Sequence, residues 1–135
     1  MTSCVLDTHI LLDFWVFEAP EALPLLRQIE AGHLHWLTTA AMRDELERVL
    51  GYPQMVARLQ SRGRPAAEVM AAFDRWARPQ AEAPRAPYRC KDPDDQKFID
   101  LAVQHQCTLH SRDRQILCMK NRLLRCNVTL NPALP

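Results

Sequence analysis

Short apolar runs alternate along the chain with longer segments in which apolar residues recur every three or four positions. The short runs predict β-strands at residues 3–6, 34–37, 108–110 and 127–130. The periodic segments predict helices that begin near residue 10, that span residues 19–31, 40–50, 54–76 and 93–106, and that start at residue 113. Strands separated by helices, with helix outnumbering strand, indicate an α/β layer fold with a mainly parallel sheet.

The segment 78–87 is the only compositional break in the chain. Three prolines alternate there with alanines and charged residues, which predicts an extended surface loop rather than a helix. Because this loop is too short to separate two domains, we expect one domain over residues 1–135. Gly63 predicts a break that divides residues 54–76 into two helices.

Composition is typical of globular proteins, with 47% hydrophobic and 24% charged residues over 135 positions. No apolar run approaches the ~20 residues of a membrane span, and the N-terminus lacks the basic and apolar regions of a signal peptide. We therefore expect a cytoplasmic protein with no membrane partner. The cysteines are odd in number, widely spaced and without a Cys-x-x-Cys pair, which favours reduced thiols over disulfides or zinc ligation: Cys4, Cys90, Cys107, Cys118 and Cys126.

The net charge of +1 hides an uneven distribution of charged residues. Residues 1–57 carry eight acidic and three basic residues, whereas residues 58–91 carry eight basic and three acidic ones. An acidic front half and a basic middle fit a cation-binding site beside a surface for a polyanion. Charge alone favours the simpler interpretation, in which the arginines lie on a solvated helix face.

Two aspartates stand where a predicted strand gives way to a helix. Asp7 closes the first strand, and Asp113 follows the strand at residues 108–110 after two intervening residues. Sites in parallel sheets form at the carboxyl ends of the strands, so both positions suit a site. Aspartates also cap helices, and that alternative stays open for Asp7 and Asp113.

Two further carboxylates share the apolar face of their helices. Glu45 follows Met42 by three positions and precedes Val49 by four, which places it within the buried stripe. An inward carboxylate costs several kcal/mol unless it is paired or binds a metal, so Glu45 needs a partner. A salt bridge to a core-facing arginine, or a position at the edge of the stripe, is the alternative.

Asp95 precedes Phe98, Ile99 and Ala102 by three, four and seven residues and therefore shares their face. The helix dipole would explain the presence of Asp94 and Asp95 in the first turn. It would not explain why one of them lies on the apolar face.

Four carboxylates in one pocket require a compensating charge, and a divalent metal supplies it. Ligands that are all oxygen suit Mg²⁺ or Mn²⁺, and such sites serve phosphoryl-transfer chemistry. Basic residues near the predicted site are candidates for gripping a phosphate backbone: Lys91, Arg112 and Arg114.

These residues lie in four segments that resemble, in order, the four motifs of PIN domains: residues 5–11, 39–46, 92–102 and 109–113. The resemblance covers essentially the whole chain and implies a three-layer α/β/α sandwich. It also implies an endoribonuclease dependent on Mg²⁺ or Mn²⁺. The third segment looks like the branch of VapC-type toxins, which a cognate antitoxin holds inactive and which are often homodimers.

In this resemblance the acidic quartet corresponds to Asp7, Glu45, Asp95 and Asp113. Further residues match positions that support or flank the site: Thr8, His9, Ser111, Asp92 and Asp94. His9 stands where asparagine is common, and it would orient Asp7 or a metal-bound water. Asp94 makes the third motif ambiguous by one position, and the apolar-face argument favours Asp95.

Other functions remain as alternatives to the nuclease. One is a catalytically silent PIN module that binds RNA or a protein partner, against which the intact acidic quartet argues. Another is a phosphotransfer domain of receiver or phosphatase type with Asp7 as acceptor or nucleophile, but the first strand lacks an Asp-x-Asp. A purely structural interpretation, with four helix caps and no site, fails mainly on Glu45.

Overall fold

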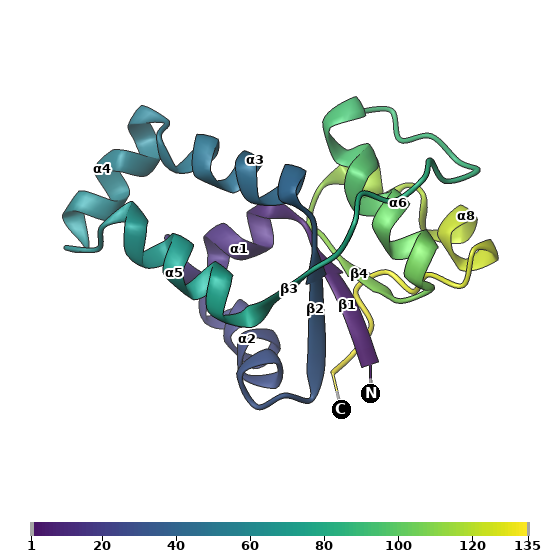
Figure 1. The fold of residues 1–135 in the computed structure, drawn as a ribbon, viewed down its shortest axis with the longest axis horizontal. Helices are drawn as coiled ribbons and strands as arrows, with labels where there is room; N and C mark the ends of the chain where they lie inside the picture. The colour runs from purple at the N-terminus through teal and green to yellow at the C-terminus, as the bar shows by residue number, and fades with distance from the viewer. Residues whose placement is uncertain (1, 135) are drawn as a thin grey trace.

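Four strands form an all-parallel sheet in the order β3-β2-β1-β4. The computed structural model describes residues 2–134. The strands are β1 (Thr2–Leu6), β2 (Leu34–Thr38), β3 (Ala77–Pro79) and β4 (Thr108–His110). Since β1 lies between β2 and β4, the chain reverses its direction of travel across the sheet at β1 (Figure 1). A reversal of this kind opens a crevice at the carboxyl ends of the strands, where sites of α/β proteins form.

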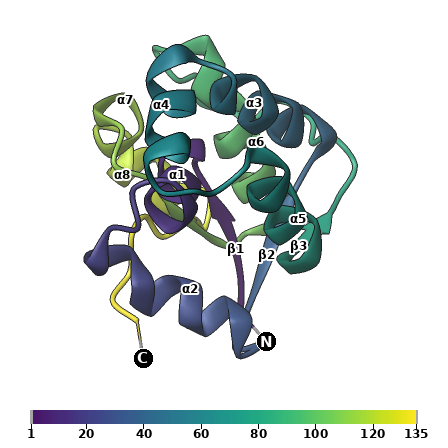
Figure 2. The same cartoon turned by 90° about the vertical axis from the view of Figure 1, so that its left-hand side faces the viewer.

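Helices cover both faces of this sheet, which confirms the predicted α/β fold and its three layers (Figures 1 and 2). One face is covered by α1 (Thr8–Trp15), α2 (Leu23–Glu30), α3 (Ala40–Leu50), α4 (Pro53–Ser61) and α5 (Ala66–Trp76). The other is covered by α6 (Gln96–His105), α7 (Arg114–Leu117) and α8 (Lys120–Arg125). Two 3₁₀ turns, η1 (Pro20–Ala22) and η2 (Pro93–Asp95), lead into α2 and α6.

The pleat of β1 distributes its side chains between the two layers. Cys4 and Leu6 pack with α1 to α5, and Val5 packs with α6 to α8. All three are buried, as expected of a central parallel strand that is covered on both faces. The strand can therefore carry a carboxylate only at its end, and Asp7 is the next residue.

Two details of the predicted elements are wrong. Residues 78–87 do not begin as a loop, because β3 pairs with β2 up to Pro79. The sheet tolerates Pro79 because β3 is an edge strand. Residues 127–130 form only an isolated bridge between Leu130 and Leu109, since Asn127 and Asn131 adopt φ values of 62° and 47° and keep the extended run short.

Helix starts also differ by a few residues from the sequence pattern. The segments expected to be helical from residues 19 and 93 open as 3₁₀ turns, each with proline in its first turn, and become α-helical at Leu23 and Gln96. Of the helices within residues 2–134, none has the length and apolar character needed to cross a bilayer.

Candidate active site

Asp7 follows β1 directly and is held at the sheet's carboxyl edge by hydrogen bonds of its backbone and of both carboxylate oxygens. Its backbone N–H donates to the His110 carbonyl of β4 at 3.0 Å. Its Oδ1 accepts the His9 N–H at 3.0 Å, which caps α1, and its Oδ2 accepts the Ser111 hydroxyl at 2.6 Å. The capping alternative for Asp7 is therefore correct, and it leaves the carboxylate facing the crevice where a site would form.

Asp113 is positioned in the same way after β4. Its Oδ1 accepts the Gln115 N–H at 2.8 Å and caps α7, while its own N–H donates to the Ser111 hydroxyl oxygen at 3.0 Å. Ser111 thus connects the two aspartates, in agreement with its predicted supporting place. The backbone of Ser111 is fixed by the side chain of Asn131. The Asn131 Oδ1 accepts the Ser111 N–H at 2.9 Å, and the Asn131 Nδ2 donates to the Ser111 carbonyl at 2.7 Å.

Asp95 completes a cluster of three carboxylates with Asp7 and Asp113. One oxygen from each of the three lies within 4.8 Å of the others. Asp95 is only 8% exposed, and its Oδ2 is buried without a hydrogen-bond partner. A buried carboxylate oxygen with no partner is costly, so this atom lacks the cation or donor that would stabilise it.

The electrostatics of the cluster reflect this shortage of positive charge. Burial, followed by the charges of Asp113 and Asp7, raises the pKa of Asp95 to about 7. Burial also raises the pKa of Asp7, although the Ser111 hydroxyl and the His9 N–H oppose that effect. Three oxygen ligands that repel one another in a buried crevice fit a hard divalent cation.

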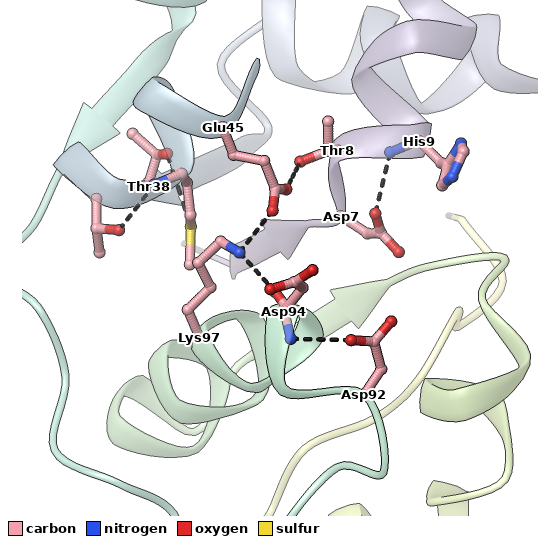
Figure 3. A network of polar contacts seen from close by, with 10 residues as sticks. Asp7, Thr8, His9, Thr38, Glu45, Asp92, Asp94 and Lys97 are labelled. Atoms are coloured by element: carbon pink, nitrogen blue, oxygen red, sulfur yellow. Dashed lines mark hydrogen bonds and ion pairs between the residues drawn. The ribbon is translucent and has the colours of Figure 1, made fainter. Parts of the chain in front are cut away.

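Glu45 faces the same cavity but stands outside this cluster. Its Oε1 accepts from the Lys97 ammonium at 2.7 Å, and its Oε2 accepts the Thr8 hydroxyl (Figure 3). Its side chain is 14% exposed, which agrees with the predicted inward orientation. The partner is a lysine of α6 rather than the arginine considered from the sequence.

Lys97 is the site residue that sequence reasoning missed. It lies in the first turn of α6, where the helix dipole disfavours a basic side chain. That placement was the available signal, because a lysine at a helix N-terminus implies a compensating carboxylate or carbonyl nearby. Lys97 finds both, since its ammonium also donates to the Asp94 carbonyl.

The cavity has a volume of about 330 Å³ and brings together all four predicted carboxylates. Its lining also includes several residues with polar side chains: Thr8, His9, Arg48, Tyr52, Gln54, Asp92 and Asp94. The side chain of Asp94 is exposed and lies outside the three-aspartate cluster, whereas that of Asp95 is buried and belongs to it. Asp92 accepts the Asp94 N–H at 3.0 Å and caps the 3₁₀ turn η2, whose last residue is Asp95 (Figure 3).

The three basic residues expected to bind nucleic acid do not line this cavity. Arg112 makes a two-point ion pair with Asp13, at 2.7 and 2.9 Å, beside a separate cavity of about 250 Å³ that also contains His110. Lys91 and Arg114 are exposed and adjoin Asp92 and Asp113 in the chain. Arg48 lines the cavity instead, one helical turn after Glu45.

Part of the basic middle of the chain serves the fold. Arg62 pairs with Glu18 at 3.0 Å, and Arg64 pairs with the same carboxylate at 3.4 Å. The guanidinium of Arg75 stacks over Trp76 at 4.6 Å from the ring centroid. Arg62 and Arg64 lie in the turn between α4 and α5, and Arg75 lies on α5, so these arginines contact the chain itself.

The fold and the acidic crevice define an α/β protein whose site lies at the carboxyl edge of a parallel sheet. The profile of the PIN domain matches residues 3–110, so the chain belongs to the PIN domain family. PIN domains are generally nucleases, and they generally use divalent metals. The match includes Asp7, Glu45 and Asp95 and ends before Ser111 and Asp113, whose place in the site rests on the geometry. No curated protein matches the chain.

Proposed function

We propose that this protein is a metal-dependent endoribonuclease in which Asp7, Asp95 and Asp113 hold Mg²⁺ or Mn²⁺. The observation that carries the proposal is the convergence of three aspartates, one of which presents a buried oxygen without a partner. The donor set contains only oxygen, which favours these hard cations over zinc. A cation bound there would supply Lewis-acid chemistry for the hydrolysis of a phosphodiester.

The protein's own side chains prepare the site for that chemistry. Ser111 and the first turn of α1 fix the rotamer of Asp7, and the first turn of α7 fixes Asp113. The hydrogen bonds from Ser111 and His9 favour the ionised form of Asp7, which is the form that ligates a cation. The site is thus organised before substrate arrives, and little reorganisation is needed when it binds.

Two residues of the cavity suit a nucleic-acid strand. Arg48 offers a planar guanidinium for a phosphate, and Tyr52, 42% exposed, offers an aromatic face for an unstacked base. A guanidinium that can donate hydrogen bonds to a phosphate lies in the same cavity as an aromatic ring on which a base can stack. This combination supports a single-stranded substrate, because its unpaired bases are free to turn outward. Tyr52→Ala is therefore expected to raise KM more than it lowers kcat, in steady-state cleavage of a short single-stranded RNA.

We further propose that this nuclease is the toxin of a toxin–antitoxin pair, held inactive in the cytoplasm by a cognate antitoxin and active as a homodimer. The support is the resemblance of residues 92–102 to the third motif of that branch of PIN domains. Induced expression in a bacterial host is expected to arrest growth, and Asp95→Asn is expected to relieve the arrest. Equal growth arrest by both proteins would contradict the toxin role.

The nuclease itself is tested by incubating the purified protein with a mixed-sequence RNA pool. Cleavage is expected with Mn²⁺, is expected to cease with EDTA, and is expected to fall at least about 100-fold in Asp95→Asn. Asp44→Asn is the matched control, because Asp44 is exposed on α3 and does not line the cavity. Cleavage by Asp95→Asn at the parent rate would contradict the proposed site. Absence of cleavage by a folded protein that binds Mn²⁺ would favour a silent PIN module that binds RNA or a protein partner.

A further inference from the structure

Glu45 is the carboxylate of the cavity that already has a positive partner. The Lys97 ammonium lies 2.7 Å from its Oε1, and the Thr8 hydroxyl donates to its Oε2. Both carboxylate oxygens are therefore engaged by donors of the chain itself. The side chains of Lys97 and Glu45 are 23% and 14% exposed, so the pair is shielded from most of the solvent that would weaken it.

Lys97 is held in place by more than this ion pair. Its ammonium also donates to the Asp94 carbonyl and lies 4.9 Å from the centroid of the Phe98 ring. It is the second residue of α6, and Asp95 immediately precedes that helix. The same turn of backbone therefore places a carboxylate in the three-aspartate cluster and an ammonium beside Glu45.

The three aspartates have no comparable partner. The hydrogen bonds to Asp7 and Asp113 come from a hydroxyl and from backbone N–H groups. The Oδ2 of Asp95 is buried without any partner. Among residues 2–134, Asp7, Asp95 and Asp113 form the group of carboxylates whose oxygens lie within 4.8 Å of one another, and Glu45 is not part of it. The four predicted carboxylates are thus divided into Glu45, which a lysine neutralises, and a cluster of three aspartates without such a partner.

A site with two metal ions needs carboxylates enough to hold a second ion about 3.5–4 Å from the first. Glu45 is the lining carboxylate that extends the cluster toward α3, and Lys97 and Thr8 already occupy its oxygens. A second cation on Glu45 would have to break the contact between Oε1 and the Lys97 ammonium. The ammonium would still remain close to that cation, because Lys97 is anchored on α6. Repulsion between two divalent ions and a nearby ammonium is strong in a partly buried cavity, so it disfavours binding of the second ion.

We propose that Lys97 takes the place of a second metal ion, so that the three aspartates hold one divalent cation while the ammonium neutralises Glu45. This inference rests on the proposed function and specifies the number of ions at that site. Lys97 is a positioning residue in this scheme, because it acts through Glu45. One divalent ion and one ammonium carry three positive charges against the four negative charges of Asp7, Glu45, Asp95 and Asp113.

The number of bound ions is measured by titrating the full chain with Mn²⁺ alone, with free Mn²⁺ followed by electron paramagnetic resonance. One Mn²⁺ per chain is expected for the parent protein. Lys97→Met leaves Glu45 without its partner and is expected to bind a second Mn²⁺. The control Lys120→Met removes an exposed lysine at the start of α8 and is expected to bind one.

Glu45→Gln provides a test that does not depend on the fold tolerating the loss of Lys97. It keeps the ammonium and removes a carboxylate that does not ligate the ion, so one Mn²⁺ is expected to bind within about tenfold of the parent affinity. The double variant Glu45→Gln with Lys97→Met removes both charges and is expected to return the count to one.

The outcomes separate this inference from the function on which it rests. Two Mn²⁺ ions in the parent protein, one ion in a folded Lys97→Met protein, or loss of Mn²⁺ from Glu45→Gln would each overturn the role of Lys97. The nuclease site would still stand in those cases. No Mn²⁺ binding by the parent protein would overturn both.

Discussion

Replacing Asp95 by asparagine is expected to stabilise the metal-free protein at neutral and alkaline pH. The substitution keeps the shape of the side chain and removes a charge that the fold does not compensate. Asp95 is buried, its Oδ2 has no partner, and it faces the carboxylates of Asp7 and Asp113. Ionisation of Asp95 therefore destabilises the folded state, and unfolding removes this destabilisation because it exposes the carboxylate to water.

The magnitude follows from the pKa of Asp95, which burial and the neighbouring aspartates raise from 3.8 to about 7. Between these values the folded state keeps a proton that the unfolded chain has lost, so the free energy of unfolding falls as pH rises through this window. One pKa unit corresponds to 1.36 kcal/mol, so the loss reaches up to about 4 kcal/mol above pH 7. Asp95→Asn has no such charge and is therefore expected to be more stable than the parent by this amount. The difference corresponds to a melting temperature higher by on the order of 10 °C.

Urea unfolding in EDTA measures this difference, with the fluorescence of the three tryptophans, of which Trp15 and Trp36 are buried, as the signal. The advantage of Asp95→Asn over the parent is expected to be near zero at about pH 4 and greatest at about pH 8. Asp94→Asn is the matched control, because its exposed side chain lies one residue away and outside the cluster. It is expected to change stability by less than about 0.5 kcal/mol at either pH.

Saturating Mn²⁺ is expected to narrow the difference in stability between Asp95→Asn and the parent at about pH 8. An ion at about 100 times its Kd stabilises the parent by about 2.7 kcal/mol, and Asp95→Asn, which lacks one ligand, gains less. Equal stability of the parent and Asp95→Asn at about pH 8 in EDTA would refute the reasoning, since it would mean that the folded protein does not bear the cost of that charge.

Three further substitutions test the groups that position the site and the core beneath it. Ser111→Ala removes the hydroxyl that lowers the pKa of Asp7, so Mn²⁺ affinity measured by calorimetry is expected to fall, and Ser111→Thr is expected to restore it; unchanged affinity in Ser111→Ala would contradict this role. Asn131→Ala removes two hydrogen bonds to the Ser111 backbone and is expected to cost about 1–3 kcal/mol in urea unfolding; no loss would show that the C-terminal segment does not hold the loop. Leu46→Ala opens a cavity at a fully buried position of α3 and is expected to lower the free energy of unfolding by about 2–5 kcal/mol in the same assay. A loss below about 1 kcal/mol would contradict tight packing around Leu46.

The sequence pattern located the aspartates of the site because their signals are local. Asp7 directly follows a short apolar run, Asp113 follows the predicted strand at residues 108–110, and the spacing from Asp95 to Phe98 and Ile99 puts Asp95 on the buried face. The structure retains that placement although the first turn is a 3₁₀ turn rather than an α-helix. A shift of one helical start does not move a residue off a face that spans several positions.

Partners that lie far apart in the chain were not predictable in this way. The periodicity of α3 placed Glu45 inward, but its ion pair with Lys97 joins residues 52 positions apart. Asn131 reaches Ser111 over 20 positions, from a segment whose pattern predicted a strand. Such contacts depend on the packing of whole layers, which the local pattern does not encode.

The local pattern also failed to predict the strand β3 and the partner of Arg112, because both depend on contacts between distant parts of the chain. Ala77–Pro79 is too short to show alternation, and its pairing with β2 is a property of the assembled sheet. Arg112 is next to Ser111 in the chain and suggested a phosphate contact, yet its guanidinium pairs with Asp13 of α1 beside a different cavity. Residues that are neighbours in sequence after a strand can thus have partners in different cavities.

The place where a divalent cation binds decides whether the three aspartates form a metal site. The decisive measurement is an anomalous difference map from crystals of the protein grown with Mn²⁺. We expect a peak among the carboxylate oxygens of Asp7, Asp95 and Asp113, with the Lys97–Glu45 ion pair intact beside it. A peak elsewhere on the chain, or an empty cluster at saturating Mn²⁺, would contradict this expectation.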